Sequence, residues 1–125
     1  STTDDFVSFT PNQFIVRAAG GVGFYTNAAT TSGVEMAAGG SSWTSLSDAR
    51  MKENVRDVAG EAVLERLARL PIFEWNYTSQ NPRIRHMGPT AQDFRAAFGL
   101  GESDRHIDTI DADGVALAAA RALAE

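Results

Sequence analysis

The pattern of apolar and polar positions changes character near residue 46. Before that point it shows no helical periodicity, and short apolar runs at 14–17, 23–26 and 33–36 alternate with small residues. Glycine, asparagine and serine separate these runs at intervals of about ten residues, which is typical of strands joined by turns. The pattern therefore predicts a β-meander or a β-solenoid over 1–46.

Strands as short as these bury too little surface to form a stable unit alone. They become stable when neighbouring strands cover their edges, as happens when three chains wind into a fibre stalk. We therefore interpret 1–46 as the end of a β-rich stalk, of the β-solenoid or triple-β type. A β-hairpin appended to the following domain is the alternative interpretation.

The second part of the chain, 47–125, has an α+β pattern. An apolar stripe at helical spacing predicts a helix over 61–70, which Pro71 ends. Alternation of apolar and polar residues predicts a strand over 72–77 with its aromatic side chains on one face. Residues 83–86 are the predicted partner strand.

Three further elements are predicted toward the C-terminus. Proline favours the first turn and glycine the end of a helix, so we expect a helix over 89–98 that Gly99 ends. A short strand is predicted over 107–110 and a turn over 111–114. The last residues, 115–125, are rich in alanine and poor in charge, which predicts a helix that needs partners. We interpret it as the start of a C-terminal trimeric helix.

Composition narrows the possible functions. Hydrophobic residues make up 43% of the 125 residues, which is enough for a core. The net charge of −5 argues against a nucleic-acid partner, which would require clustered basic residues. The chain has no cysteine, so disulfides and thiol nucleophiles are excluded. No apolar run approaches the roughly 20 residues of a membrane-spanning helix, and we expect no membrane partner, no cofactor and no metal.

The candidate catalytic residues lie near residue 47, where the β-rich pattern of 1–46 ends and the α+β pattern of 47–125 begins. A serine becomes a nucleophile when a nearby base removes its proton, and a desolvated lysine can be that base. Ser47 and Lys52 are five positions apart, which puts them roughly 140° apart on a helix and on opposite faces of a strand. Contact between them therefore requires a bend or two chains. A capping serine and a solvated lysine remain the alternative.

Several motifs occur in an order that resembles a known family. Ser-Asp-Ala-Arg-Met-Lys-Glu-Asn-Val at 47–55 is followed by an aromatic strand at 73–77 and by His-Met-Gly-Pro-Thr-Ala-Gln-Asp-Phe at 86–94. The segment 110–118 resembles the strand, turn and helix that lead into a coiled coil. Together these motifs, over about 43–120, resemble the intramolecular chaperone domain of endosialidase-type phage tailspikes, the peptidase S74 family.

The resemblance implies a function and a site. Such a domain trimerises, assists the folding of the upstream fibre, and then releases itself by one cut. Carried over to this chain, Ser47 is the nucleophile, Lys52 is its general base, and Leu46–Ser47 is the scissile bond. The enzyme would be a serine peptidase that turns over once, on its own chain. Residues with supporting roles would be His86, Gln92, Asp48 and Asn54, although a local structural role explains each of them as well.

The expected fold is thus a small α+β chaperone domain over 47–125, preceded by a β-rich stalk segment, in an intertwined homotrimer. The expected partners are two further copies and the upstream part of the same chain. The expected location is a phage tail fibre or spike, or a bacterial or prophage-encoded surface protein, folded in the host cytoplasm before release. The family's long coiled coil is missing or truncated at Glu125. A structural trimerisation cap that does not cut itself is therefore the alternative function.

Overall fold

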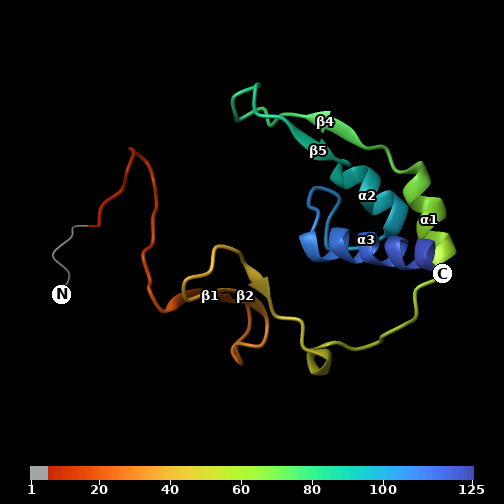
Figure 1. Cartoon of the computed structure of the whole chain (residues 1–125), viewed down its shortest axis with the longest axis horizontal. Helices are drawn as coiled ribbons and strands as arrows, with labels where there is room; N and C mark the ends of the chain where they lie inside the picture. Colours follow the sequence, from red (N-terminus) through yellow and green to blue (C-terminus); the bar gives the residue numbers. More distant parts are fainter. Residues whose placement is uncertain (1–5) are drawn as a thin grey trace. The chain divides into compact units, whose positions relative to one another are not determined.

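The computed structural model describes residues 6–125, which form two compact units. The first unit is Ser1–Val55 and the second is Arg56–Glu125 (Figure 1). Both helices and small antiparallel sheets are present, so the fold is α+β, as the sequence predicts. Each unit is described below by itself.

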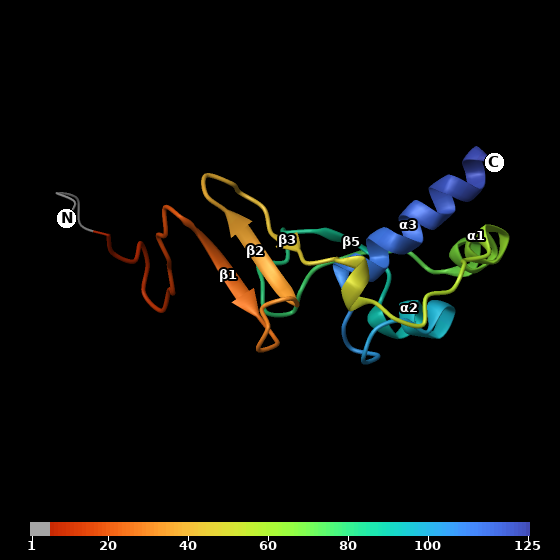
Figure 2. The ribbon, with the colours of Figure 1, turned by 90° about the horizontal axis from the view of Figure 1, so that it is seen from below.

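The first unit contains a three-stranded antiparallel sheet in the order β1-β2-β3 (Figure 2). Strand β1 is Gly21–Tyr25, β2 is Gly33–Ala37 and β3 is Thr44–Ser45. The first two confirm the predicted strands near 23–26 and 33–36. The third is only two residues long, and no periodic pattern predicts an element of that length.

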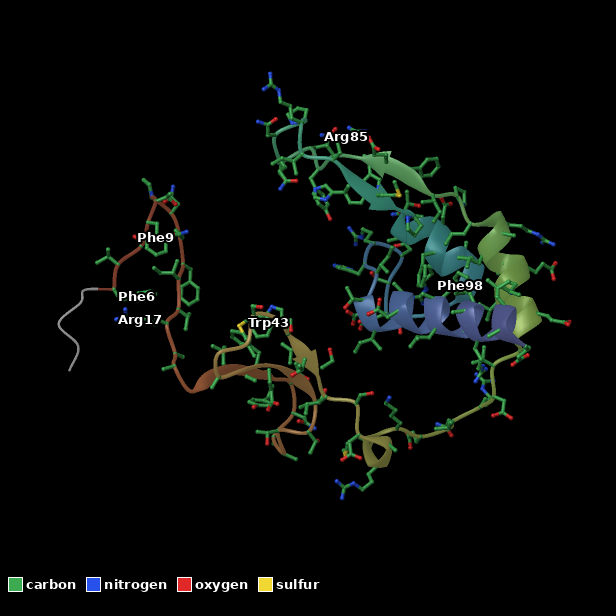
Figure 3. The ribbon with its side chains drawn as sticks, viewed as in Figure 1. Phe6, Phe9, Arg17, Trp43, Arg85 and Phe98 are labelled. Atoms are coloured by element: carbon green, nitrogen blue, oxygen red, sulfur yellow. The ribbon has the colours of Figure 1, made fainter. Side chains whose placement is uncertain are left out.

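One face of this sheet is apolar. Phe24 pairs with Val34 across the strands, and the ring of Trp43 lies 5.6 Å from that of Phe24 (Figure 3). Even so, Phe24 remains 56% exposed and Trp43 51% exposed. Within the described part of the first unit, nothing buries this face. The sheet therefore has the property inferred from its sequence: it requires neighbours to be covered.

The strand predicted over 14–17 is wrong for the single chain. These residues are irregular, and Phe14 is 88% exposed. A strand needs a hydrogen-bonding partner, and among the described residues β1 pairs with β2 alone. A turn closed by the hydrogen bond from Gly21 N to Ala18 O then separates this segment from the sheet.

The second unit consists of three helices and a β-hairpin (Figure 1). Helix α1 packs against both α2 and α3, and β4 pairs with β5 in an antiparallel hairpin. The bounds of these elements are α1 Gly60–Arg69, β4 Phe73–Trp75, β5 His86–Gly88, α2 Ala91–Phe98 and α3 Thr109–Ala124.

The core of the second unit lies among its helices. Leu70, Phe94 and Val115 form the buried cluster, and the ring of Phe98 lies 5.2 Å from that of Phe94 (Figure 3). Other residues that are partly buried against the cluster are Val63, Leu67, Ala97 and Ile107. The apolar stripe predicted for 61–70 is therefore confirmed, since it supplies Leu70 and its neighbours on α1. A core of this size leaves a unit of this length marginally stable.

Helix α1 begins in close contact with α3. A Cβ atom added at Gly60 would lie 2.7 Å from the Cβ of Ala122. We expect Gly60→Ala to lower the free energy of unfolding by about 1–2 kcal/mol, because the helices would have to separate. Gly114→Ala is the matched control. Its added Cβ meets nothing within 4 Å, and alanine in a helix interior should raise stability by about 1 kcal/mol. Urea unfolding of both variants measures the difference, and equal effects would contradict the close packing.

Helix α3 corrects two sequence predictions. The strand predicted over 107–110 and the turn predicted over 111–114 are both wrong, because α3 begins at Thr109 and continues through Gly114. The Asp108 side chain accepts a hydrogen bond from Ile110 N and so caps the helix. Burial of Val115 then favours the helix despite the glycine.

The hairpin and α2 differ from the prediction only in their limits. The second strand is His86–Gly88 rather than 83–86, since a turn with a hydrogen bond from Ile84 N to Asn81 O occupies part of the predicted strand. Helix α2 begins at Ala91, where the Thr90 hydroxyl accepts from Asp93 N. Its end is confirmed at Gly99, which has a φ of +65°.

The outer side of α3 remains apolar and uncovered in the second unit. Leu117 is 72% exposed and Leu123 is 75% exposed. Among residues 6–125, no helix has the length and apolar character needed to cross a membrane.

Candidate active site

Ser47 and Lys52 are in contact within one chain. Lys52 Nζ donates a hydrogen bond to Ser47 Oγ at 2.6 Å. The intervening residues form a short 3₁₀-helix, η1, at Ala49–Met51. This bend makes possible a contact that neither a regular helix nor a strand allows at a spacing of five. Of the two routes to contact that the sequence leaves open, the structure contains the one within a single chain.

The bend is held by hydrogen bonds from both backbone and side chains. Met51 N donates to Asp48 O at 3.0 Å, and Lys52 N donates to Ala49 O at 3.1 Å. The Asp48 carboxylate caps the turn by accepting from Arg50 N at 2.9 Å. It also accepts from the Arg50 guanidinium, through Nη2 at 2.8 Å and through Nε at 3.2 Å.

The same contacts set the charge state of the turn. The Arg50 guanidinium, and after it the Arg50 backbone N–H, holds the pKa of the Asp48 carboxyl below its usual value. A carboxyl with a lowered pKa stabilises the folded turn above its ordinary pKa, and this contribution disappears as the pH falls through the lowered one. The Asp48–Arg50 pair is therefore fully charged at neutral pH.

The residue before Ser47 is anchored to the sheet. Leu46 N donates to Gly33 O at 3.1 Å, directly after β3 pairs with β2. The Leu46–Ser47 bond thus joins a segment fixed on the sheet to a segment fixed by η1. A peptide bond between two anchored segments has a defined position relative to the Ser47 hydroxyl.

Comparison with known proteins assigns the segment that contains this site. Residues 47–99 match the family model described as the chaperone of endosialidase, Peptidase_S74. This segment is similar to the endosialidase chaperone family. The suspected resemblance is thereby confirmed for η1, α1, the β4–β5 hairpin and α2. No curated protein and no solved structure matches the chain.

The limits of the endosialidase chaperone match agree with the site. The match begins at Ser47, the residue expected to follow the cut, and it ends at Gly99. It therefore includes both Ser47 and Lys52, whereas the sheet that anchors Leu46 lies before it. Helix α3 lies after it, so the family model says nothing about the exposed leucines of that helix.

Both members of the Ser47–Lys52 pair are exposed in the single chain. An ammonium can only donate hydrogen bonds, so a lysine acts as a base only as the neutral amine. Removal from water favours the neutral amine. The geometry for proton transfer is thus present, while the desolvation that activates the base has to come from covering the pair.

His86 and Gln92, the other predicted supporting residues, belong to the second unit. His86 is half-buried beside Trp75 and Tyr77, with ring centroids 5.0 and 4.9 Å away, and its Nε2 lies 2.9 Å from Gln80 Oε1. These contacts account for His86 as a packed residue of the hairpin. Gln92 is exposed in the first turn of α2. Supporting roles for both at the cleavage site stay predictions.

Asp48 lies in the turn between Ser47 and Lys52, and Asn54 follows Lys52 by two residues in the chain. Asp48 orients the turn, whereas Asn54 has a φ of +54° and redirects the chain after Lys52. Arg50 is a further residue of this site, and the motif at 47–55 contains it without indicating a role for it. Its spacing of two from an aspartate that caps a turn is the signal that would have identified it.

Proposed function

We propose that this chain is a C-terminal intramolecular chaperone that trimerises, assists folding of the upstream fibre, and then cuts itself at Leu46–Ser47. The observation that carries the proposal is the 2.6 Å contact between Lys52 Nζ and Ser47 Oγ, in a segment that matches the endosialidase chaperone family. We place the parent protein in a phage tail fibre or spike, or in a related bacterial or prophage-encoded surface protein.

The proposed reaction is an acyl transfer followed by hydrolysis. Ser47 Oγ attacks the carbonyl carbon of Leu46 while its proton passes to Lys52 Nζ. The Leu46–Ser47 C–N bond breaks, and the departing amino group takes up a proton. Water then hydrolyses the resulting ester, which leaves a carboxylate on Leu46 and restores the Ser47 hydroxyl. Attack within the chain is an N-to-O acyl shift, and attack by Ser47 of a second copy gives the same products.

Exposed apolar surface supports the trimer. The sheet of the first unit leaves Phe24 and Trp43 half-exposed, and α3 leaves Leu117 and Leu123 mostly exposed. The buried core of the second unit is small. Association of three copies would bury such surfaces, at a gain of about 25 cal/mol for each Å² removed from water.

Trimerisation also accounts for the timing of the cut. Lys52 is exposed in one chain. Covering the pair with a neighbouring chain would remove it from water, which favours the neutral amine that can act as a base, so cleavage would follow correct assembly. The cut would then remove the chaperone only from fibres that had folded.

The proposal is tested with a chain that carries additional upstream residues before Ser1. After expression, its mass under denaturing conditions is expected to reveal a C-terminal fragment that begins at Ser47. Sedimentation of the undenatured sample is expected to show a trimer. An uncut chain that is strictly monomeric at high concentration would contradict the proposal.

A second candidate is a structural trimerisation cap that stays attached to its fibre. The observation in its favour is the exposure of Lys52, since a lysine that stays solvated is not a base. An intact Leu46–Ser47 bond in a stable trimer would support this function over the first.

A further inference from the structure

We infer that Arg50, acting through Asp48, is a positioning residue that holds Lys52 against Ser47. The inference rests on the proposed self-cleavage and names the part of the chain that makes the Ser47–Lys52 contact possible. The Arg50 side chain donates to the Asp48 carboxylate and not to Ser47 Oγ or the Leu46 carbonyl, so its role is to fix the turn. The Arg50 side chain is 88% exposed, and its guanidinium pairs with Asp48.

The argument begins with the weakness of η1 as an isolated element. A three-residue 3₁₀-helix contributes few backbone hydrogen bonds, and a helical turn of this size is not stable alone. Between Ser47 and Lys52, only the hydrogen bonds from Met51 N and Lys52 N close it along the backbone. A side-chain contribution is therefore needed to keep the turn populated.

Asp48 and Arg50 supply that contribution through several hydrogen bonds to one carboxylate. One carboxylate accepts the Arg50 backbone N–H at 2.9 Å and also two guanidinium nitrogens of the same residue, at 2.8 and 3.2 Å. Exposed ion pairs contribute little when both side chains are free to move. Here the backbone hydrogen bond fixes the carboxylate, and a planar guanidinium matches its two oxygens.

The effect on Lys52 follows from the backbone. The carbonyl oxygens of Asp48 and Ala49 accept from Met51 N and Lys52 N, so the orientation of the peptide after Asp48 determines where Lys52 begins. When the turn opens, a spacing of five no longer brings Nζ back to Ser47 Oγ. The population of the turn thus sets the fraction of chains in which the pair is aligned.

Four variants separate the contribution of the Asp48 cap from that of the Asp48–Arg50 ion pair. Asp48→Ala removes the cap and the pairing, and should reduce the cleavage rate of assembled trimers about five- to tenfold. Asp48→Asn keeps a capping oxygen but not the charge, and Arg50→Gln loses the pairing alone. Each of these should slow cleavage about two- to threefold. Because both remove the same interaction, the double variant Asp48→Asn/Arg50→Gln should be no slower than the slower single one.

The control is Arg69→Gln, which removes an exposed ion pair between Arg69 and Glu65 on α1. It should leave the cleavage rate unchanged. Trimer content is measured for every variant, because a structural defect would reduce assembly together with the rate. Wild-type cleavage kinetics by Asp48→Ala in fully assembled trimers would overturn the inference.

A second measurement does not depend on cleavage. This measurement uses uncut chain that retains Ser47. The nuclear Overhauser contact between the Ser47 β protons and the Lys52 ε protons reports directly whether the two side chains are aligned. It should weaken several-fold in Asp48→Ala and about two- to threefold in Asp48→Asn and in Arg50→Gln. If wild type never cuts but this contact responds as expected, the proposed self-cleavage fails and the positioning role of Arg50 and Asp48 stands. An unchanged contact in Asp48→Ala overturns the positioning role even if wild type cuts.

Discussion

Ser47→Ala is expected to leave the upstream-extended chain whole while trimers still form. The substitution removes the only atom that is proposed to attack the Leu46 carbonyl, and it deletes the hydrogen bond from Lys52 Nζ. Loss of a catalytic nucleophile typically costs several orders of magnitude in rate, so no fragment should be visible by intact mass. Because Ser47 is exposed, its hydroxyl contributes little to stability.

Two further variants make this result specific. Lys52→Met keeps a long side chain without a base, and should be as inactive as Ser47→Ala. Ser45→Ala is the matched control, since Ser45 lies on β3 two residues before the nucleophile and pairs with Val34 through its backbone. It should cut normally. Cleavage at the same bond in Ser47→Ala or Lys52→Met would show that the pair is not the catalytic one.

The site illustrates what sequence spacing can and cannot predict. The motif at 47–55 contains both Ser47 and Lys52, it lies in the segment that matches the endosialidase chaperone family, and the contact between the two residues is present. Their spacing predicts no contact in any regular element. The decisive feature is a three-residue turn, and its stability depends on side-chain hydrogen bonds between Asp48 and Arg50 rather than on a periodic pattern.

The sequence predicted the helices more accurately than the strands. Helix α1 was predictable because its apolar stripe and Pro71 agree. The start of α3 was not, since Asp111-Ala-Asp-Gly is the composition of a turn. In the structure the capping by Asp108 and the burial of Val115 and Ala119 outweigh the cost of a helical glycine, about 1 kcal/mol. Such tertiary burial is invisible in a local window.

The prediction of a strand over 14–17 is wrong because a strand depends on a partner that the local sequence does not specify. The apolar residues of this segment have the composition of a strand, but pairing depends on a partner that lies elsewhere. In the single chain the segment stays irregular and Phe14 is exposed. If three copies wind together as proposed, this segment is where strand pairing between chains would be gained.

Phe94→Ala is expected to lower the free energy of unfolding of the second unit by about 3–5 kcal/mol. The Phe94 side chain is 5% exposed, lies in the buried cluster with Leu70 and Val115, and contacts the ring of Phe98. For a unit of this size, such a loss is comparable with the whole stability of the fold. Urea unfolding followed by circular dichroism measures it.

Phe73→Ala is the matched control, because Phe73 is 49% exposed on β4 and its truncation should cost about 1 kcal/mol. The comparison also tests whether cleavage reports folding. Phe94 lies in the second unit and Ser47 in the first, so Phe94→Ala changes no atom of the turn that aligns Ser47 with Lys52. If desolvation of Lys52 requires an assembled trimer, Phe94→Ala should nevertheless abolish the cut, whereas Phe73→Ala should retain it. Efficient cleavage by unfolded Phe94→Ala chains would instead mean that the turn is sufficient for the reaction and that assembly does not control it.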